Sequence, residues 1–393
     1  MKKLLFISFF AALIAVGCDE PGLDDDGNLP PTEQTPDNEQ DDDNNSDDPT
    51  DDPADEPDTI PNDEIWYTSS DGEIVEPYIG PGAVEFPFGD GVSIVSNTYA
   101  DGIGIIKFSS PVTAIEEYAF HGCESLTSIT IPDRVTRIGI FAFAGCNSLT
   151  SVTIPDSVMK IGAYAFLCRN LTAFYGKFAS ADNKCLIVNG TLNEFANGCG
   201  LTKYTIPDGV TTIGEGAFNS RENLTSITIP DSVTAIEVAA FWACSLTDIT
   251  IPNSVTTIGD SAFRLCLSLT SVTIPDSITT IGEGVFLGCR SLTSITIPDS
   301  VTTIGYYAFR SCLSLTSITI PDSVTEIGKS AFQSCSSLAN IYCKATTPPG
   351  LIYLAFSDIS DDAKIYVPRE SVEAYKAAKY WSEYAHLIKP YDF

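Results

Sequence analysis

The chain contains very little histidine and little positive charge. His121 and His386 are its only two histidines in 393 residues, which excludes histidine-rich metal sites. Lysine and arginine number 21 against 52 acidic residues, so the formal net charge is −31 at pH 7. A polyphosphate partner needs a basic surface, and this balance therefore excludes a nucleic-acid-binding protein of the usual kind. No C-x-x-C pair occurs, so zinc is not expected.

The apolar run at the N-terminus is too short to span a bilayer. Residues 4–16 supply about 13 apolar residues, whereas a spanning helix needs about 20. The run follows Lys2 and Lys3 and ends just before Cys18, which is the anatomy of an export signal. The order Ala15-Val16-Gly17-Cys18 resembles the lipobox of bacterial lipoproteins, which implies lipid attachment at Cys18 and an outer-membrane, surface-exposed location in the cell envelope. A plain signal peptide at residues 1–18 is the alternative.

Residues 19–64 lack basic and aromatic side chains altogether. They carry twenty acidic residues among proline, asparagine and threonine. Such a composition cannot bury enough apolar surface to fold. We therefore predict an acidic disordered tether that holds the folded part away from the membrane.

The rest of the chain is a repeat array with a period of 23 residues. The unit is clearest in residues 297–319, which read IPDSVTTIGYYAFRSCLSLTSIT. A fixed period in the twenties predicts a solenoid in which each coil contacts only its neighbours. Each copy has one phenylalanine at the same place, and these marker residues are Phe120, Phe143, Phe166, Phe218, Phe241, Phe263, Phe286, Phe309, Phe332 and the degenerate Phe356, with Phe195 in an irregular copy.

Within one unit, the spacing L-x-x-I-x-I predicts a short strand. Leu315, Ile318 and Ile320 would face the core, while Ser317 and Thr319 would face outward. A single coil would bury too little apolar surface to offset its ordering cost, so stacking is obligatory. We expect the strands of successive coils to form one continuous parallel sheet.

This pattern resembles the BspA-like leucine-rich repeats of bacterial surface proteins. The resemblance covers about residues 109–393 and implies a curved or gently twisted solenoid that is secreted or surface-anchored and used for adhesion. The predicted solenoid spans residues 109–343. An irregular segment at 174–206 also resembles the family, in which a longer repeat interrupts the regular ones, and its Asn189-Gly190 pair predicts a hairpin.

We expect both ends to be capped, because open sheet edges would pair with other chains. Residues 65–108 contain Asp71-Gly72 and Asp101-Gly102 between β-prone runs, which predicts β hairpins. Residues 344–393 hold the degenerate last repeat, followed by helical spacing from Glu370 to Ala385 that predicts a lid helix.

Eight of the eleven cysteines after Cys18 recur at corresponding places of successive repeats. Parallel side chains in a stack rarely meet the torsion that a disulfide requires. We therefore favour a reduced, buried ladder over a disulfide framework. These residues are Cys123, Cys146, Cys168, Cys244, Cys266, Cys289, Cys312 and Cys335.

The sequence contains no recognisable catalytic constellation. His121 occupies a variable repeat position, and His386 lies at the end of the predicted lid helix. The outward strand positions are mostly hydroxyls, so paired carboxylates are not expected there. We therefore predict a non-enzymatic protein without cofactor or metal.

Two sets of residues are candidates for ligand binding. The first is the hydroxyl-rich sheet face, represented by Ser294, Thr296, Ser317 and Thr319, although serine and threonine are also ordinary strand residues. The second is a set of aromatic residues near the Ala-Phe pair of each repeat, typical binding anchors that could instead simply cover coil edges. These aromatic residues are Tyr118, Phe141, Tyr164, Trp242, Tyr306 and Tyr307.

The signal, the tether and the repeat resemblance together favour a lipid-anchored surface protein. We predict that its solenoid recognises host extracellular matrix proteins or other cells. The alternative is a glycan-binding module that assists polysaccharide capture, since sugar recognition uses hydroxyls and aromatic rings. The membrane would be contacted through the lipid anchor only.

Overall fold

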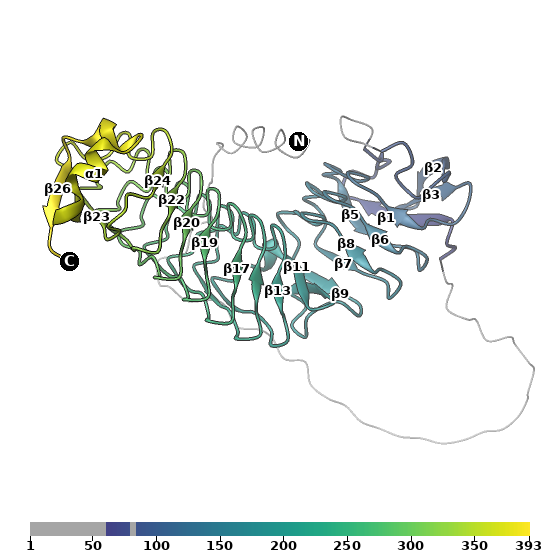
Figure 1. Ribbon diagram of the computed structural model, residues 1–393. Helices are drawn as coiled ribbons and strands as arrows, with labels where there is room; N and C mark the ends of the chain where they lie inside the picture. The colour runs from purple at the N-terminus through teal and green to yellow at the C-terminus, as the bar shows by residue number, and fades with distance from the viewer. Residues whose placement is uncertain (1–59, 79–83) are drawn as a thin grey trace, which may run out of the picture. The chain divides into compact units, whose positions relative to one another are not determined.

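The computed structural model describes residues 60–78 and 84–393. About twelve turns of roughly 23 residues form a solenoid whose successive coils lie side by side in chain order (Figure 1). This confirms the predicted repeat solenoid. The predicted signal segment, Cys18 and the tether up to residue 59 lie outside the described residues.

The predicted strands form the first of two parallel ladders. Where strands of neighbouring coils pair, they pair in register, as Thr319 does with Tyr342. The ladder is not one continuous sheet as expected, because residues 292–298 form no strand and other coils also break it. The strands are β5 (Leu126–Ile129), β7 (Ser151–Thr153), β9 (Ala173–Tyr175), β12 (Lys203–Thr205), β14 (Ser226–Thr228), β16 (Asp248–Thr250), β18 (Ser271–Thr273), β21 (Ser317–Ile320), β23 (Asn340–Cys343), β25 (Lys364–Pro368) and β26 (Ile388–Tyr391).

A second parallel ladder of two-residue strands was not foreseen from the sequence. It is built on the T-I pair that follows each strand by a few residues, with Thr303 beside Glu326 and Ile304 beside Ile327. Its strands are β4 (Ala114–Ile115), β6 (Arg137–Ile138), β8 (Lys160–Ile161), β13 (Thr212–Ile213), β15 (Ala235–Ile236), β17 (Thr257–Ile258), β19 (Thr280–Ile281), β20 (Thr303–Ile304), β22 (Glu326–Ile327) and β24 (Gly350–Leu351).

The third side of each coil is a turn with its own hydrogen-bond ladder. The residue two positions before the marker phenylalanine adopts the left-handed conformation in ten coils, with φ between 55° and 67°. This conformation points its N–H at the next coil, where Tyr307 N–H, for example, donates to the Lys329 carbonyl. The marker's N–H does the same, as Phe309 does to Ala331. The turns therefore join the coils as strands do.

The core is a column of stacked phenylalanine rings. Adjacent marker rings lie 5.1 to 5.6 Å apart and are tilted by no more than 14° in both regular parts of the array. The column is interrupted after Phe166, and the next marker, Phe195, packs against Phe218 with its ring tilted by 32°. Two hydrophobic clusters result, one before and one after this irregular repeat.

The irregular repeat contains the predicted hairpin. Strands β10 (Cys185–Val188) and β11 (Thr191–Phe195) pair antiparallel across Asn189-Gly190, both with positive φ, which confirms the prediction. A short 3-10 helix, η2 (Asn197–Cys199), follows. Strand β11 then pairs in parallel with β13 and so returns the chain to the regular array.

At the start of the array, one of the two predicted hairpins is present. Strands β2 (Ile94–Ala100) and β3 (Ile103–Phe108) pair across Asp101-Gly102. The expected hairpin at Asp71-Gly72 is wrong. Strand β1 (Glu64–Ser69), which precedes that turn, pairs instead with β3 and, antiparallel, with β5 of the first coil. This pairing occupies the edge of β5; that the segment serves as a cap remains a prediction.

At the other end, the predicted single helix over residues 370–385 is wrong. The segment forms η3 (Arg369–Ser371), α1 (Val372–Ala377) and η4 (Trp381–Tyr384), and the helix is broken at the extended Ala378. Tyr375 and Trp381 are both fully buried, and they donate to the Ala345 and Pro349 carbonyls. On a continuous helix, side chains six residues apart would point about 120° apart. The break lets both side chains enter the core.

Candidate functional site

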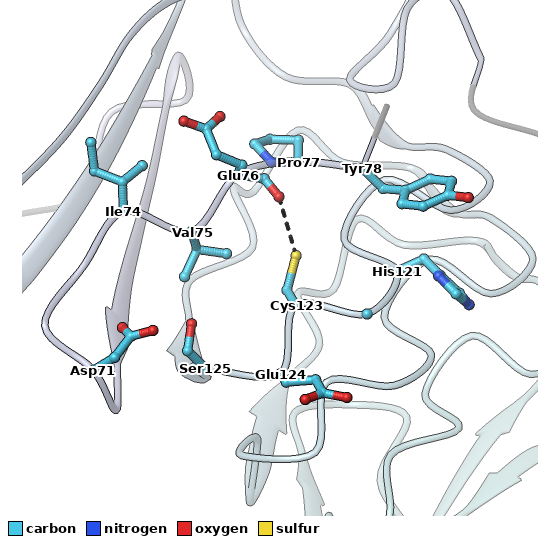
Figure 2. A pocket seen from close by; sticks show the side chains of 11 residues that line it. Asp71, Ile74, Val75, Glu76, Pro77, Tyr78, His121, Cys123, Glu124 and Ser125 are labelled. Atoms are coloured by element: carbon cyan, nitrogen blue, oxygen red, sulfur yellow. Dashed lines mark hydrogen bonds between the residues drawn. The ribbon is translucent and has the colours of Figure 1, made fainter. Parts of the chain in front are cut away.

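The first candidate site is a cavity of about 570 Å³ between residues 71–78 and the first repeat turn. Three acidic residues line it, Asp71, Glu76 and Glu124. Figure 2 shows Cys123 between them, its Sγ donating to the Glu76 carbonyl oxygen at 3.3 Å. The Glu73 N–H donates to Asp71 and holds the pKa of that carboxyl below its usual range, so it is ionised at neutral pH. The cavity is acidic.

Aromatic rings form one rim of this cavity. The Tyr78 and His121 rings lie 5.2 Å apart, and His121 also contacts Tyr118 at 5.6 Å. Burial lowers the pKa of His121 below its ordinary value, so its ring is neutral at pH 7. The rim offers aromatic surface without positive charge.

The rim continues along the solenoid as a stack of three predicted site residues. Tyr118, Phe141 and Tyr164 lie in successive coils, with ring centroids 5.4 Å and 5.0 Å apart. They occupy the left-handed position of the turn, where bulky side chains are uncommon. Tyr164 ends the stack over Gly216, where a Cβ atom would lie 2.1 Å from the tyrosine ring. We call these three residues the aromatic ridge; their faces cover one another and their edges remain accessible.

The other three predicted aromatic residues do not join the ridge. The Trp242 ring is covered by the Arg264 guanidinium of the next coil at 5.1 Å, and Tyr307 by Arg310 at 5.5 Å. Tyr306 is 46% exposed and packs over Gly328. They are separate surface features rather than parts of one site.

The predicted hydroxyl residues lie where the first ladder is interrupted. Ser294, Thr296, Ser317 and Thr319 are all exposed, but Ser294 and Thr296 belong to the segment that forms no strand. Thr296 and Thr319 line a cavity of about 440 Å³ together with Pro298, Pro321, Asp276, Asp299 and Lys344. The structure therefore brings two of the four residues into one cavity.

Many other threonines have a structural role. In two further columns the hydroxyl donates to the backbone carbonyl of the preceding coil, as Thr270 does to Thr247 and Thr325 to Thr302. Seven of the recurring cysteines act similarly, with thiols that donate to a marker phenylalanine's carbonyl, as Cys289 does to Phe263 at 3.1 Å. All eleven cysteines of the described residues are free, in agreement with the predicted reduced ladder.

One aromatic group was missed by sequence reasoning. Tyr342 and Tyr366 stack at 4.9 Å on the outward face of β23 and β25, and Tyr391 packs edge-on against both at 5.3 and 5.4 Å. Phe393 lies 4.9 Å from Tyr391 and is 53% exposed. We call these four residues the C-terminal aromatic cluster. Tyr342 and Tyr366 continue the column of Thr319, but the last repeats depart so far from the 23-residue unit that the sequence alone hides this register.

Residues 60–78 and 84–393 bring no three histidine, cysteine or acidic side chains together in a way that could hold a metal ion. His386 is exposed and remote from His121 in the chain. Within the same ranges, no helix is long and apolar enough to cross a membrane.

Comparison with known proteins places this geometry in a family. The model of the BspA type leucine-rich repeat region matches in six copies at residues 93–183, 191–275 and 256–368, more than half of the chain. The chain belongs to this family. BspA type repeats form binding or adhesion modules and are typically non-catalytic scaffolds. No curated protein matches the chain.

Solved structures of bacterial leucine-rich-repeat proteins are similar to it. A leucine-rich repeat protein from Eubacterium ventriosum is 27% identical, with 58% of this chain and 63% of that chain covered and a TM-score of 0.50. The present chain thus spans less than two thirds of that protein. A leucine rich cell surface protein from Faecalibacterium prausnitzii is 28% identical over 75% and 89% of the two chains (TM-score 0.38). One from Bacteroides ovatus is 28% identical over 76% and 90% (TM-score 0.32).

Proposed function

We propose that this protein is a lipid-anchored adhesion protein of the bacterial cell surface that binds host matrix proteins or other cells without catalysing a reaction. The observation that carries the proposal is the acidic cavity beside the aromatic ridge. Carboxylates at Asp71, Glu76 and Glu124 attract a positive charge, and the adjoining rings of Tyr78 and Tyr118 suit the flat or aliphatic part of a basic side chain. A lysine or arginine on a partner protein fits this combination.

The electrostatic field of the chain supports the same kind of partner. A net charge of −31 raises the encounter rate with basic protein surfaces and keeps acidic ones away. Interface anchors are commonly aromatic residues in the middle of a patch. The ridge supplies three such residues in a row directly beyond the cavity.

Binding to immobilised matrix proteins, such as collagen and laminin, tests the proposal. Tyr118→Gly removes a ridge residue at a turn position where Gly216 and Gly284 show that glycine fits. Tyr307→Gly is the matched control, because it makes the same change at the same position of a distant coil. We expect Tyr118→Gly and Asp71→Asn/Glu124→Gln to weaken binding about tenfold or more, and Tyr307→Gly to have little effect. Absence of saturable binding by the unaltered protein would refute the proposal.

The anchor is tested separately. Cys18→Ser removes the proposed acylation site, so no acyl chain remains to hold the protein on the membrane. We expect the variant to lose incorporation of labelled palmitate and to leave the outer-membrane fraction. Retention of both label and membrane association would contradict lipid attachment at Cys18.

A glycan-binding function is the second candidate, and a different part of the molecule favours it. The C-terminal aromatic cluster lies beside the hydroxyl-lined cavity at Thr296 and Thr319, since Thr319 pairs in register with Tyr342. Aromatic rings with polar tips next to hydroxyl and carboxyl groups are the groups that bind sugars. A glycan array without hits would remove this candidate.

A further inference from the structure

The outward face of the last three strands differs from the rest of the first ladder. In most coils this face carries serine and threonine, but from β23 onward the columns change to large and charged residues. Register pairs Ser317 with Asn340 and then Lys364 in one column. In the next, Thr319 is followed by Tyr342, Tyr366 and Lys389.

Three lysines are interleaved with the aromatic rings. Lys364 lies two residues before Tyr366 on β25, Lys389 pairs with Tyr366 across the ladder, and Lys344 follows Tyr342 by two residues and lines the neighbouring cavity. All three are exposed. None of them forms an ion pair with a carboxylate of the described residues. The face therefore presents three positive charges that are not held in an ion pair within the described residues.

The sign of these charges is opposite to the net charge of the chain, which is −31. Unpaired lysines on one face attract an anion, whereas the net negative charge of the chain repels anions in general. An anion therefore needs further contacts on this face in order to bind. The aromatic rings add a second requirement, because they gain most from a ligand with an apolar face. Tyr391 is 41% exposed and Phe393 is 53% exposed, so their rings have surface to offer such a ligand. A sugar ring with a carboxylate or sulfate substituent meets both requirements.

We propose that the outward face of β23, β25 and β26 binds an acidic polysaccharide, one that carries uronate or sulfate groups. The lysines pair with the anionic substituents while the C-terminal aromatic cluster packs against the sugar rings. The adjoining cavity of about 440 Å³ extends the surface along the ladder, where Asp276 and Asp299 accept hydrogen bonds from sugar hydroxyls. This inference deepens the glycan-binding candidate and is independent of the acidic cavity at the other end of the array.

The test measures binding of the full chain to heparin and to polygalacturonate, with dextran as a neutral control and poly-L-glutamate as an acidic control without sugar. One variant is Tyr342→Thr/Tyr366→Thr, which restores the residue that Thr319 provides in the same column and so should preserve the fold. The other is Lys364→Ala/Lys389→Ala. Its matched control is Lys160→Ala/Lys203→Ala, which removes two exposed lysines from other coils. Thermal unfolding confirms that each variant is folded.

We expect heparin or polygalacturonate to bind, with affinity that falls as salt rises, and dextran and poly-L-glutamate to bind at least tenfold more weakly. Both the tyrosine and the lysine variants should lose about tenfold or more, and the control none. Equal binding of poly-L-glutamate, or full binding by the tyrosine variant, would overturn the assignment to a sugar. Unchanged binding by both variants would overturn the site. Matrix-protein binding in the same variants tests adhesion separately, because these changes leave the acidic cavity intact.

Discussion

At the scale of single residues, each repeat position has one physical task. The recurring cysteine fills a small buried space and donates its thiol hydrogen to a carbonyl of the preceding coil. Burial raises the pKa of the Cys289 thiol to about 12, and that of Cys244 likewise. These thiols stay protonated at physiological pH, and a protonated buried thiol is a poor nucleophile. The column is therefore a packing element.

Replacing one thiol of the column tests this role. Cys289→Ala removes a buried sulfur and its hydrogen bond to Phe263, and we expect a loss of about 1–2 kcal/mol in the free energy of unfolding. Cys123→Ala, at the half-exposed first position, should cost less. Chemical denaturation of both variants gives the comparison. An equal loss at the two positions would show that burial does not set the contribution.

The left-handed turn position permits a stabilising change. Ser261 has a φ of 60°, a conformation that costs a residue with a Cβ atom about 1 kcal/mol and glycine almost nothing. The corresponding position of the next coil is already Gly284. Ser261→Gly should raise the free energy of unfolding by up to about 1 kcal/mol, whereas Ser271→Gly, in strand β18, should lower it. A stability loss at both serines would contradict the account of the turn.

At the scale of elements, the sequence predicted what repeats and missed what is short or irregular. Period and apolar spacing located the first ladder and the core residues, and the Asn189-Gly190 pair located the hairpin. A two-residue strand such as β22 is too short to show the alternation of apolar and polar residues that marks a longer strand. The left-handed turn position has no characteristic residue type, because tyrosine, serine and glycine all occupy it. The prediction of a single helix after residue 370 was wrong, because the chain breaks the helix to bury both Tyr375 and Trp381.

The irregular repeat holds an ionic pair that repeat alignment could not reveal. Glu194 and Arg221 are both almost fully buried, and their closest atoms, Oε2 and Nη2, are 3.7 Å apart. The Glu194 carboxylate also accepts the N–H of Phe166 at 3.2 Å, and so joins the coils on either side of the interruption. Burial raises the pKa of Glu194 to about 7, although the Arg221 charge acts in the opposite direction. Burial also lowers the pKa of Arg221.

This raised pKa predicts a pH dependence of stability. Between about pH 4.5 and 7, the folded state keeps a proton on Glu194 that the unfolded state has lost. The stabilisation is complete below about pH 4.5 and is lost as pH rises through 7, and it amounts to about 3 kcal/mol. Glu194→Gln cannot titrate, so the free energy of unfolding should change less with pH in the variant than in the unaltered protein. Parallel pH profiles for the two proteins would show that Glu194 does not titrate in this window.

At the scale of the whole molecule, the array behaves as a chain of neighbouring contacts rather than as one core. The described residues contain two hydrophobic clusters, one built on Phe120, Phe143 and Phe166 and the other on the markers from Phe218 onward. They meet only at the irregular repeat, where the phenylalanine column changes course at Phe195. Stability in a repeat array is approximately a sum of local terms, so a weak junction allows separate unfolding.

Equilibrium unfolding in guanidinium chloride should therefore show two transitions. Trp66 reports on the first cluster, and Trp242 and Trp381 report on the second. Phe143→Ala, which costs about 3–5 kcal/mol, should shift only the Trp66 transition, and Phe286→Ala only the other. Variants that retain only Trp66, or only Trp242 and Trp381, separate the tryptophan fluorescence of the two clusters. If both substitutions shifted both transitions equally, the array would unfold as one cooperative unit. The ion pair between Glu194 and Arg221 would then couple the stabilities of the two hydrophobic clusters across the irregular repeat.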